Sequence, residues 1–384
     1  MRRLAAGLGI GLAILGVAGC APVGTPGSTA RIEFVGSKVV DGYSFDLYRN
    51  LAYPCSISGY QTFVIGSKVG SDPAAERPLW VRMHGGGVGW FAPDGTPMPD
   101  AAHKNEESFG VLTGSVSQAG LVARVRSDPA GFRLLSVSMC DHDIYAGGDQ
   151  PDPNNPNTTP DGKPRTVNGL FATKAAIQFA LKKVPTSKFF LHGTSAGGSG
   201  VWSVAFGLEE QGLPPAGAVA DSGVINYEWQ QAINQQLPTA SCARPQPILD
   251  IIKQRLHPTF TTQGNEPDQQ VSKGELTVPI LHVWNQADHV SCGAAQMQCP
   301  LRDGITVTLG AADCHHEPMR RAIEALGPGS KSVNMRLCAS KPEYPGTCTV
   351  HTPTNDDGLV NTNPDWPADY NTAAMNWVEQ RLQD

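Results

Sequence analysis

The stretch FFLHGTSAGGSG, residues 189–200, sets a serine between glycines at the end of an apolar run. Its centre, Gly193 to Gly197, fits the Gly-x-Ser-x-Gly pattern, in which a strand turns sharply into a helix and exposes the serine hydroxyl at the rim of a sheet. The pattern alone also fits an ordinary tight turn, because glycine supplies 42 of the 384 residues. The surroundings favour the first interpretation: KFFLHG has the length of a strand, and small residues follow Ser195, where a helix must start close to the sheet.

Short apolar runs with β-branched or aromatic residues recur on both sides of this turn, and each ends in Gly, Asp or Asn. They are LWVRMHGGG, FRLLSVSM, KFFLHG, AGAVAD and VPILHVWNQAD. Helix-length segments occupy residues 169–184, 196–211, 226–236 and 247–256. Strands that alternate with helices predict an α/β fold, with a mostly parallel central sheet and helices on both faces. Ligands of such a sheet bind beyond the carboxyl ends of its strands.

The remaining segments complete one predicted domain, residues 31–384. Residues 31–40 and 61–65 alternate as strands, which we expect to be antiparallel. Residues 370–382 form an amphipathic helix, whose apolar face carries Ala374, Trp377, Val378 and Leu382. Residues 141–168 are too rich in Pro, Asn, Asp and Gly for a helix, so they predict a long loop at the same rim as Ser195. Long loops in compact domains are usually functional or disordered.

The N-terminus has the pattern of an export signal over residues 1–20. Arg2 and Arg3 precede an apolar run that is too short for a comfortable membrane span. The run ends in GVAGC, which resembles the bacterial lipobox, and this resemblance implies that Cys20 receives a lipid. An ordinary cleaved signal is the alternative. Residues 21–30 then predict a flexible tether, so the protein is expected outside the cytoplasm, either lipid-anchored to the membrane or secreted.

Eight cysteines remain if Cys20 carries a lipid, and an even number in an exported chain favours disulfides. Two pairs close small loops and are therefore expected first, Cys292 with Cys299 and Cys338 with Cys348. The other four are Cys55, Cys140, Cys242 and Cys314.

Charge and motif content narrow the function classes. A formal charge of −6, a pI near 5.9 and the lack of a Lys/Arg run give no electrostatic footprint for nucleic acid. Three clusters hold metal-ligand types, but none has the paired spacing of a zinc site, so neither a metal nor an organic cofactor is expected. These clusters are residues 141–143, residues 288–289 with Cys292, and residues 314–317.

The glycines after His84 are candidates for an oxyanion hole. His84-Gly85-Gly86-Gly87 ends an earlier apolar run, and glycine lets a backbone approach a substrate without interference from Cβ. A plain glycine turn is the alternative, but the order of the two motifs favours the catalytic interpretation. The backbone N–H groups of Gly86, Gly87 and Ala196 are therefore predicted to hold the oxyanion.

A serine nucleophile needs a base and an acid that orients it. Asp288 ends a later apolar run and is the favoured acid, with Asp221, one run earlier, as its rival. His351 follows the last predicted strand and is the favoured base. His315 and His316 lie before an earlier predicted helix and are the alternatives. The remaining candidates sit in or beside buried strands and are expected to be structural: His84, His192 and His282.

From about Leu79 to its end, the chain resembles the α/β-hydrolase superfamily. Within that superfamily it looks like the pectin acetylesterase and Notum-like carbohydrate deacetylases. The residues that carry the resemblance are SMCDHDIYAGGD, GTSAGGSG, VADSG, NQAD and CTVH. The resemblance implies the α/β-hydrolase fold and a catalytic triad of Ser195, Asp288 and His351.

The leading expectation is an exported serine hydrolase that cleaves carboxylic esters through an acyl-enzyme, removing acetyl groups from an acylated carbohydrate or another small ester. Trp90, Asp141 and Asp221 are the candidate substrate-pocket residues, and Trp90 could stack on a sugar ring. A general carboxylesterase, a lipase or a polyester depolymerase is the alternative on the same scaffold. A non-catalytic surface binding protein is the alternative from a different class.

Overall fold

The structure is a computed structural model that describes residues 22–24, 31–98 and 104–384. The expected signal and Cys20 lie outside these residues. Part of the expected tether does not hang free, because Val23 is buried against the domain and Lys174 donates a hydrogen bond to its carbonyl oxygen. Among the described helices, none combines the length and the apolar character needed to cross a bilayer.

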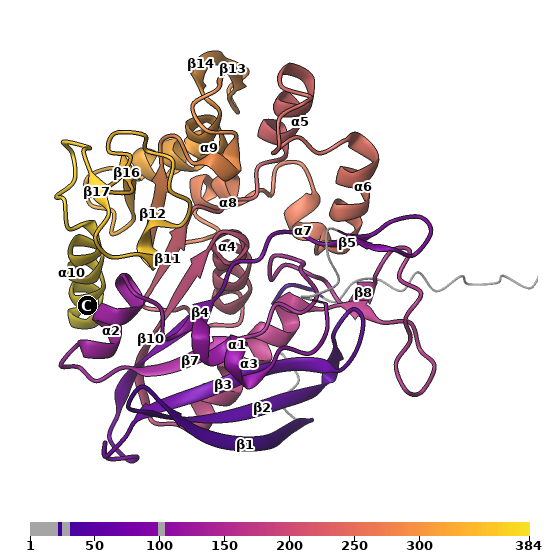
Figure 1. Ribbon diagram of the computed structural model, residues 1–384, viewed down its shortest axis with the longest axis vertical. Coiled ribbons are helices and arrows are strands. Elements are labelled where there is room, and N and C mark those ends of the chain that lie inside the picture. The colour runs from indigo at the N-terminus through magenta and orange to yellow at the C-terminus, as the bar shows by residue number, and fades with distance from the viewer. Residues whose placement is uncertain (1–21, 25–30, 99–103) are drawn as a thin grey trace, which may run out of the picture.

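A nine-stranded sheet organises the chain (Figure 1), in the order β1-β2-β3-β7-β4-β10-β11-β12-β15. Three antiparallel strands form one side of it: β1 (Ile32–Val40), β2 (Tyr43–Pro54) and β3 (Tyr60–Lys68). The other six strands run parallel: β4 (Arg77–Met83), β7 (Arg133–Val137), β10 (Thr186–Thr194), β11 (Gly217–Asp221), β12 (Ile280–Asn285) and β15 (Val333–Leu337). The sequence patterns predicted the parallel strands and did not separate out β2.

Helices cover both faces of the sheet because the buried strands alternate between two apolar cores. Leu191 of β10 packs in one core and its neighbour Phe190 packs in the other. The first core receives α3 (Gly169–Lys183), α4 (Ala196–Glu209) and α9 (Ala311–Ala325). The second receives α1 (Phe109–Ser115), α2 (Leu121–Ser127) and α10 (Tyr370–Gln383). The strand order and the two helical layers form an α/β-hydrolase fold, which confirms the prediction.

The chain between β11 and β12 adds a helical segment that Figure 1 shows at one end of the molecule, beside β5. It comprises α5 (Tyr227–Gln236), α6 (Gln246–Arg255), α7 (Pro258–Thr261) and α8 (Pro267–Lys273).

The loops outside the large sheet contain four pairs of short antiparallel strands. These pairs are β5 (Trp90–Phe91) with β6 (Pro97–Met98), β8 (Gln150–Pro151) with β9 (Thr166–Val167), β13 (Gln296–Pro300) with β14 (Thr306–Gly310), and β16 (Ala339–Ser340) with β17 (Val360–Asn361). Two 3₁₀ turns, η2 (His289–Ser291) and η3 (Pro353–Asn355), follow Asp288 and His351.

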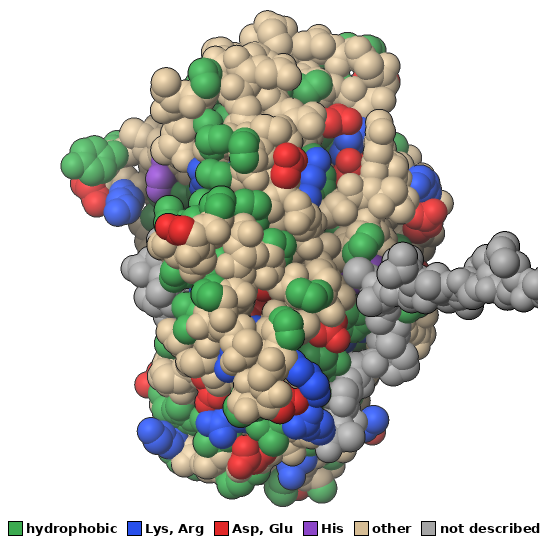
Figure 2. Space-filling view, turned by 90° about the vertical axis from the view of Figure 1, so that its right-hand side faces the viewer, with side chains coloured by type: hydrophobic (Ala, Val, Ile, Leu, Met, Phe, Trp, Pro, Cys, Tyr) green, Lys and Arg blue, Asp and Glu red, His purple; other side chains and the backbone are tan. Residues whose placement is uncertain are grey.

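Figure 2 shows the surface that faces right in Figure 1. Acidic and basic side chains are intermixed on it, with hydrophobic side chains scattered among them. The formal charge of −6 is therefore not gathered into a single acidic region on this face.

All eight cysteines that follow Cys20 are paired. The predicted bond between Cys338 and Cys348 is present. The predicted bond between Cys292 and Cys299 is wrong, because Cys299 lies on the β13–β14 hairpin, which packs on α9. The observed partners are Cys55 with Cys140, Cys242 with Cys292, and Cys299 with Cys314. Four disulfides indicate an oxidising, extracytoplasmic environment.

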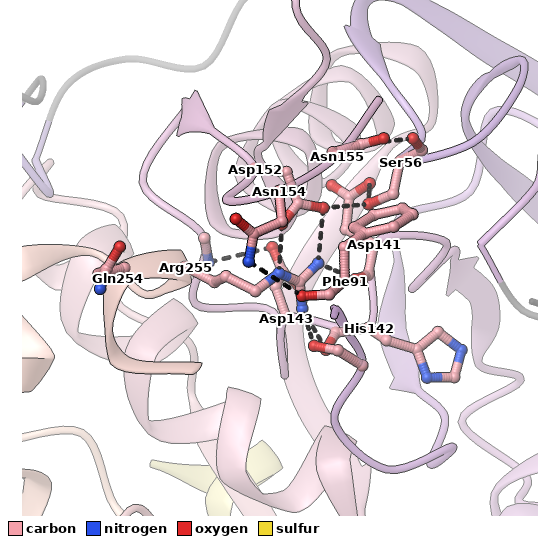
Figure 3. Close-up of polar contacts among 12 residues, drawn as sticks. Ser56, Phe91, Asp141, His142, Asp143, Asp152, Asn154, Asn155, Gln254 and Arg255 are labelled. Atoms are coloured by element: carbon pink, nitrogen blue, oxygen red, sulfur yellow. Dashed lines mark hydrogen bonds and ion pairs between the residues drawn. The ribbon is translucent and has the colours of Figure 1, made fainter. Parts of the chain in front are cut away.

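A buried arginine at the end of α6 fixes the long loop of residues 141–168 (Figure 3). Arg255 is fully buried, and its Nε lies 2.7 Å from Oδ1 of Asp152. Its other nitrogens donate to the carbonyl oxygens of Asp141, His142 and Gly89. One guanidinium therefore joins three segments, namely the loop, α6 and the chain that follows Gly86 and Gly87. The predicted loop is not disordered.

We expect Arg255→Met to lower the free energy of unfolding by about 3 to 5 kcal/mol, because it leaves the buried Asp152 carboxylate without its cation. Denaturant unfolding measures the change. Arg321→Met is the control, because Arg321 is exposed, pairs with the exposed Asp303, and leaves Glu317 its second partner Arg320; a surface pair contributes up to about 1 kcal/mol. Equal losses in the two variants would contradict the assigned role of Arg255.

Candidate active site

Ser195 occupies a strained turn between β10 and α4. Its backbone has φ 56° and ψ −122°, a conformation that residues other than glycine rarely adopt. The turn is held because the Ser195 N–H donates to the carbonyl oxygen of Asp221, at 2.8 Å, on the neighbouring strand β11. Strain of this kind is characteristic of functional sites, and the Gly-x-Ser-x-Gly prediction therefore has its expected geometry.

The two flanking glycines are required by close backbone packing. A Cβ atom on Gly193 would lie 2.0 Å from the carbonyl oxygen of Gly197. A Cβ atom on Gly197 would lie 2.0 Å from the carbonyl oxygen of Met83, at the end of β4. Both positions exclude any side chain, so the spacing of the motif follows from the approach of α4 to two strands.

The structure joins the favoured acid and base. Nδ1 of His351 lies 2.6 Å from Oδ2 of Asp288. The Asp288 side chain is fully buried, and its Oδ1 accepts a hydrogen bond from the N–H of Val290 at 2.9 Å. The other ring nitrogen of His351, Nε2, has no hydrogen-bond partner among the described residues. Asp288 thus orients the imidazole and leaves Nε2 able to accept a proton.

Asp221, the rival acid, has a different set of partners. Its carboxylate accepts hydrogen bonds from Ser222 Oγ at 2.7 Å, and from the N–H and Oγ1 of Thr354 at 2.9 and 2.6 Å. Burial raises its pKa. Asp221 therefore anchors the chain that follows His351, and the ring itself is oriented by Asp288.

The alternative bases lie inside α9, whereas the sequence placed them before that helix. His315 stacks on Trp229 with ring centroids 4.1 Å apart, and its nitrogens contact Ser291 Oγ at 3.2 Å and Val224 O at 3.1 Å. Burial lowers its pKa to about 4. His316 faces His282, with Nδ1 and Nε2 2.8 Å apart. In the described part of the chain, no carboxylate orients His315 or His316 as Asp288 orients His351.

The predicted oxyanion donors lie around Ser195. Gly86 and Gly87 have φ 155° and 78°, so this turn is restricted to glycine. Ala196 is the first residue of α4, and its N–H has no partner within the helix. His84 supports the glycine turn through Nε2, which lies 2.9 Å from Glu107 Oε2. Burial works against the charged form of His84, but Glu107 outweighs it and raises the pKa.

Two hollows meet at Ser195 and His351. One is a cavity of about 220 Å³ with a mainly apolar wall. The other is a polar cleft of about 490 Å³. The apolar wall includes Val88, Ile144, Val224, Ile225, Leu249, Ile252, Leu256 and Val290. The polar cleft includes Gly86, Ser115, Gln118, Thr194, Thr352 and Asn355.

The predicted pocket residues lie elsewhere. The carboxylates of Asp141 and Asp221 are fully buried, and Asp141 accepts hydrogen bonds from Gln61 and from the N–H of Asn168, at 2.9 and 3.0 Å. Trp90 lies half-buried in β5 and lines neither hollow. None of the three predicted residues lines either hollow: Asp141 and Asp221 tie loops together at strand ends, and Trp90 lies in β5.

Sequence reasoning missed the wall that the α5–α6 segment supplies. Leu249 and Ile252 are one helical turn apart in α6, a spacing that marks a buried face without saying what that face covers. Two cysteines from the clusters of metal-ligand residue types, Cys292 and Cys314, form disulfides.

Comparisons with known proteins add a distant likeness. No protein-family model matches the sequence, and no curated protein matches it. A mutant of the esterase rPPE aligns over 93% of this chain and 82% of its own, at 13% identity and a TM-score of 0.43. Brefeldin A esterase, described as a bacterial homologue of human hormone-sensitive lipase, aligns over 95% and 77%, at 13% identity and a TM-score of 0.41. A thermostable esterase from Pseudomonas putida aligns over 93% and 82%, at 12% identity and a TM-score of 0.39.

Acid should destabilise the protein through the cluster of His282, His315 and His316 beside the site. Burial lowers the pKa of His282 to about 3. A histidine in the unfolded chain titrates near about pH 6.5, so the unfolded state takes up a proton first and stability is lost as the pH falls below that value. We expect the unfolding free energy of His282→Gln to decline less steeply than that of the wild type between about pH 7 and pH 5, by at most about 1.4 kcal/mol per pH unit. Denaturant unfolding at each pH measures both slopes, and equal slopes would refute the buried, neutral state of His282.

Proposed function

We propose that this protein is a serine hydrolase of carboxylic esters. One observation carries the proposal: the imidazole of His351, oriented by Asp288 at 2.6 Å, borders the same two hollows as the strained Ser195. A nucleophile, a base, an orienting acid and backbone donors at a helix start are the parts that acyl transfer requires.

The reaction proceeds in two steps. Nε2 of His351 takes the proton of the Ser195 hydroxyl while Oγ attacks the ester carbonyl, and Asp288 stabilises the resulting imidazolium. The N–H groups of Gly86, Gly87 and Ala196 hold the negative charge that develops on the carbonyl oxygen. His351 then gives its proton to the departing alcohol. Water, activated by the same imidazole, hydrolyses the acyl-enzyme and restores the Ser195 hydroxyl.

The two hollows suggest the substrate class. A wall of Ile225, Leu249 and Ile252 suits an apolar acyl chain, and a cavity of about 220 Å³ is much larger than an acetyl group. The polar cleft offers Gln118, Thr352 and other hydrogen-bonding side chains, which suits an alcohol rich in hydroxyl groups, such as a carbohydrate. We therefore favour esters of longer acyl chains with a polar alcohol over acetyl esters.

We also propose that the protein is exported and held at the membrane through a lipid on Cys20. The GVAGC end of the N-terminal apolar run supports this proposal, and the four disulfides agree with export.

The catalytic assignment predicts a specific pattern of loss. Ser195→Ala and His351→Ala should each lower kcat for p-nitrophenyl butyrate by about 10⁴ to 10⁶-fold, and Asp288→Asn by about 10⁴-fold. His315→Gln is the matched control, because His315 lines the cavity without a carboxylate partner, and its kcat should change far less. Steady-state kinetics on variants with native circular dichroism measures these effects. An active His351→Ala beside an inactive His315→Gln would transfer the role of base to His315.

The acyl preference follows from the apolar cavity. Each buried methylene contributes about 0.8 kcal/mol, a factor of about four, so kcat/KM should rise from the acetate to the hexanoate ester of the same phenol by well over tenfold. Ile252→Trp, which narrows the cavity, should reduce this preference and leave acetate turnover nearly unchanged. A wild-type preference for acetate would instead favour the carbohydrate deacetylase that the sequence suggested.

A further inference from the structure

Arg244 is an exception in the wall of the apolar cavity. Among the described residues that line this cavity, it is the sole Lys or Arg, and the lining holds no Asp or Glu. It lies between α5 and α6 and lines the same cavity as the apolar residues Leu249 and Ile252. A permanent positive charge therefore borders the space that the proposed function assigns to an acyl chain.

The segment that carries Arg244 is held in place. The Arg244 N–H donates to Oδ1 of Asn234 at 2.8 Å, and Asn234 Nδ2 donates to the Arg244 carbonyl. Its Nη1 donates to the carbonyl oxygens of Ser241 and Ala243, at 2.9 and 3.0 Å. The neighbouring Cys242 is bonded to Cys292. The guanidinium is thus set before any substrate arrives, which lowers the entropic cost of binding.

Arg244 forms no ion pair with any carboxylate in the described part of the chain. Arg302 shows the contrast, because it lies within 4.0 Å of Glu228, Glu266 and Asp268. Another polar group lines the cavity, the buried hydroxyl of Tyr227, which has no hydrogen-bond partner among the described residues.

We propose that Arg244 binds a carboxylate at the far end of the substrate's acyl chain. The inference rests on the proposed function and names its substrate class, namely esters in which one carboxyl of a dicarboxylic acid is esterified and the other is free. The methylenes of the chain would pack on Leu249 and Ile252, and the free carboxylate would pair with the guanidinium. A carboxylate suits this position because the planar donors of the Arg guanidinium match the two carboxylate oxygens.

Two substrates of equal chain length test the proposal. Mono-p-nitrophenyl suberate carries the terminal carboxylate, and p-nitrophenyl octanoate lacks it. In Arg244→Met, the ratio of kcat/KM for suberate to kcat/KM for octanoate should fall about tenfold from its wild-type value, which corresponds to one charge-assisted pair. Arg244→Glu should lower the ratio further, and Arg244→Lys should retain part of it.

Lys253→Met is the matched control. Lys253 lies on α6 with Nζ 4.5 Å from the ring centroid of Tyr227, and it does not line the cavity. Its variant should keep the wild-type ratio. An unchanged ratio in Arg244→Met, or an equal fall in Lys253→Met, would overturn the proposal. Octanoate turnover distinguishes failure of this proposal from failure of the proposed function. Octanoate turnover that persists in Arg244→Met leaves the proposed function standing, whereas a wild type that hydrolyses neither ester contradicts both.

Discussion

The site depends on one constraint, the close approach of three backbone segments at the turn between β10 and α4. Gly193 and Gly197 leave no room for a Cβ atom where α4 meets β10 and the end of β4. The packing forces Ser195 into a conformation with positive φ, and a hydrogen bond to the Asp221 carbonyl on β11 holds it there. The same packing places the unpaired N–H of Ala196 next to the serine. The strain, the proposed nucleophile and one proposed oxyanion donor thus have a single origin.

Two buried aspartates at the carboxyl ends of adjacent strands position His351 in different ways. Asp288 on the β12 side orients the imidazole of His351. Asp221 on β11 binds Thr354, three residues after His351, and so fixes the chain that carries the histidine. The disulfide between Cys338 and Cys348 restrains the same chain from its other side. The proposed base, His351, is therefore positioned through its ring by Asp288 and through its backbone by Asp221 and the disulfide.

The sequence predicted the sheet, its flanking helices and the partners Asp288 and His351, because apolar periodicity and strand-end motifs are local signals. It failed where partners are set by tertiary contacts. Cys292 pairs with Cys242, 50 positions away, although Cys299 is nearer along the chain. Asp141 was expected in the pocket, yet it is buried in a network that only the folded loop creates. The apolar cavity wall also escaped prediction, because a buried helix face looks the same whether it covers a core or a substrate.

The most direct test of the central claim is peptide mapping by mass spectrometry after reaction with a fluorophosphonate. An activated serine should carry the phosphonyl group on Oγ of Ser195, and His351→Ala should abolish the adduct, because His351 supplies the base that makes this hydroxyl reactive. We expect one labelled peptide, spanning Ser195, in the wild type. Labelling at another residue, or undiminished labelling of Ser195 in His351→Ala, would contradict it.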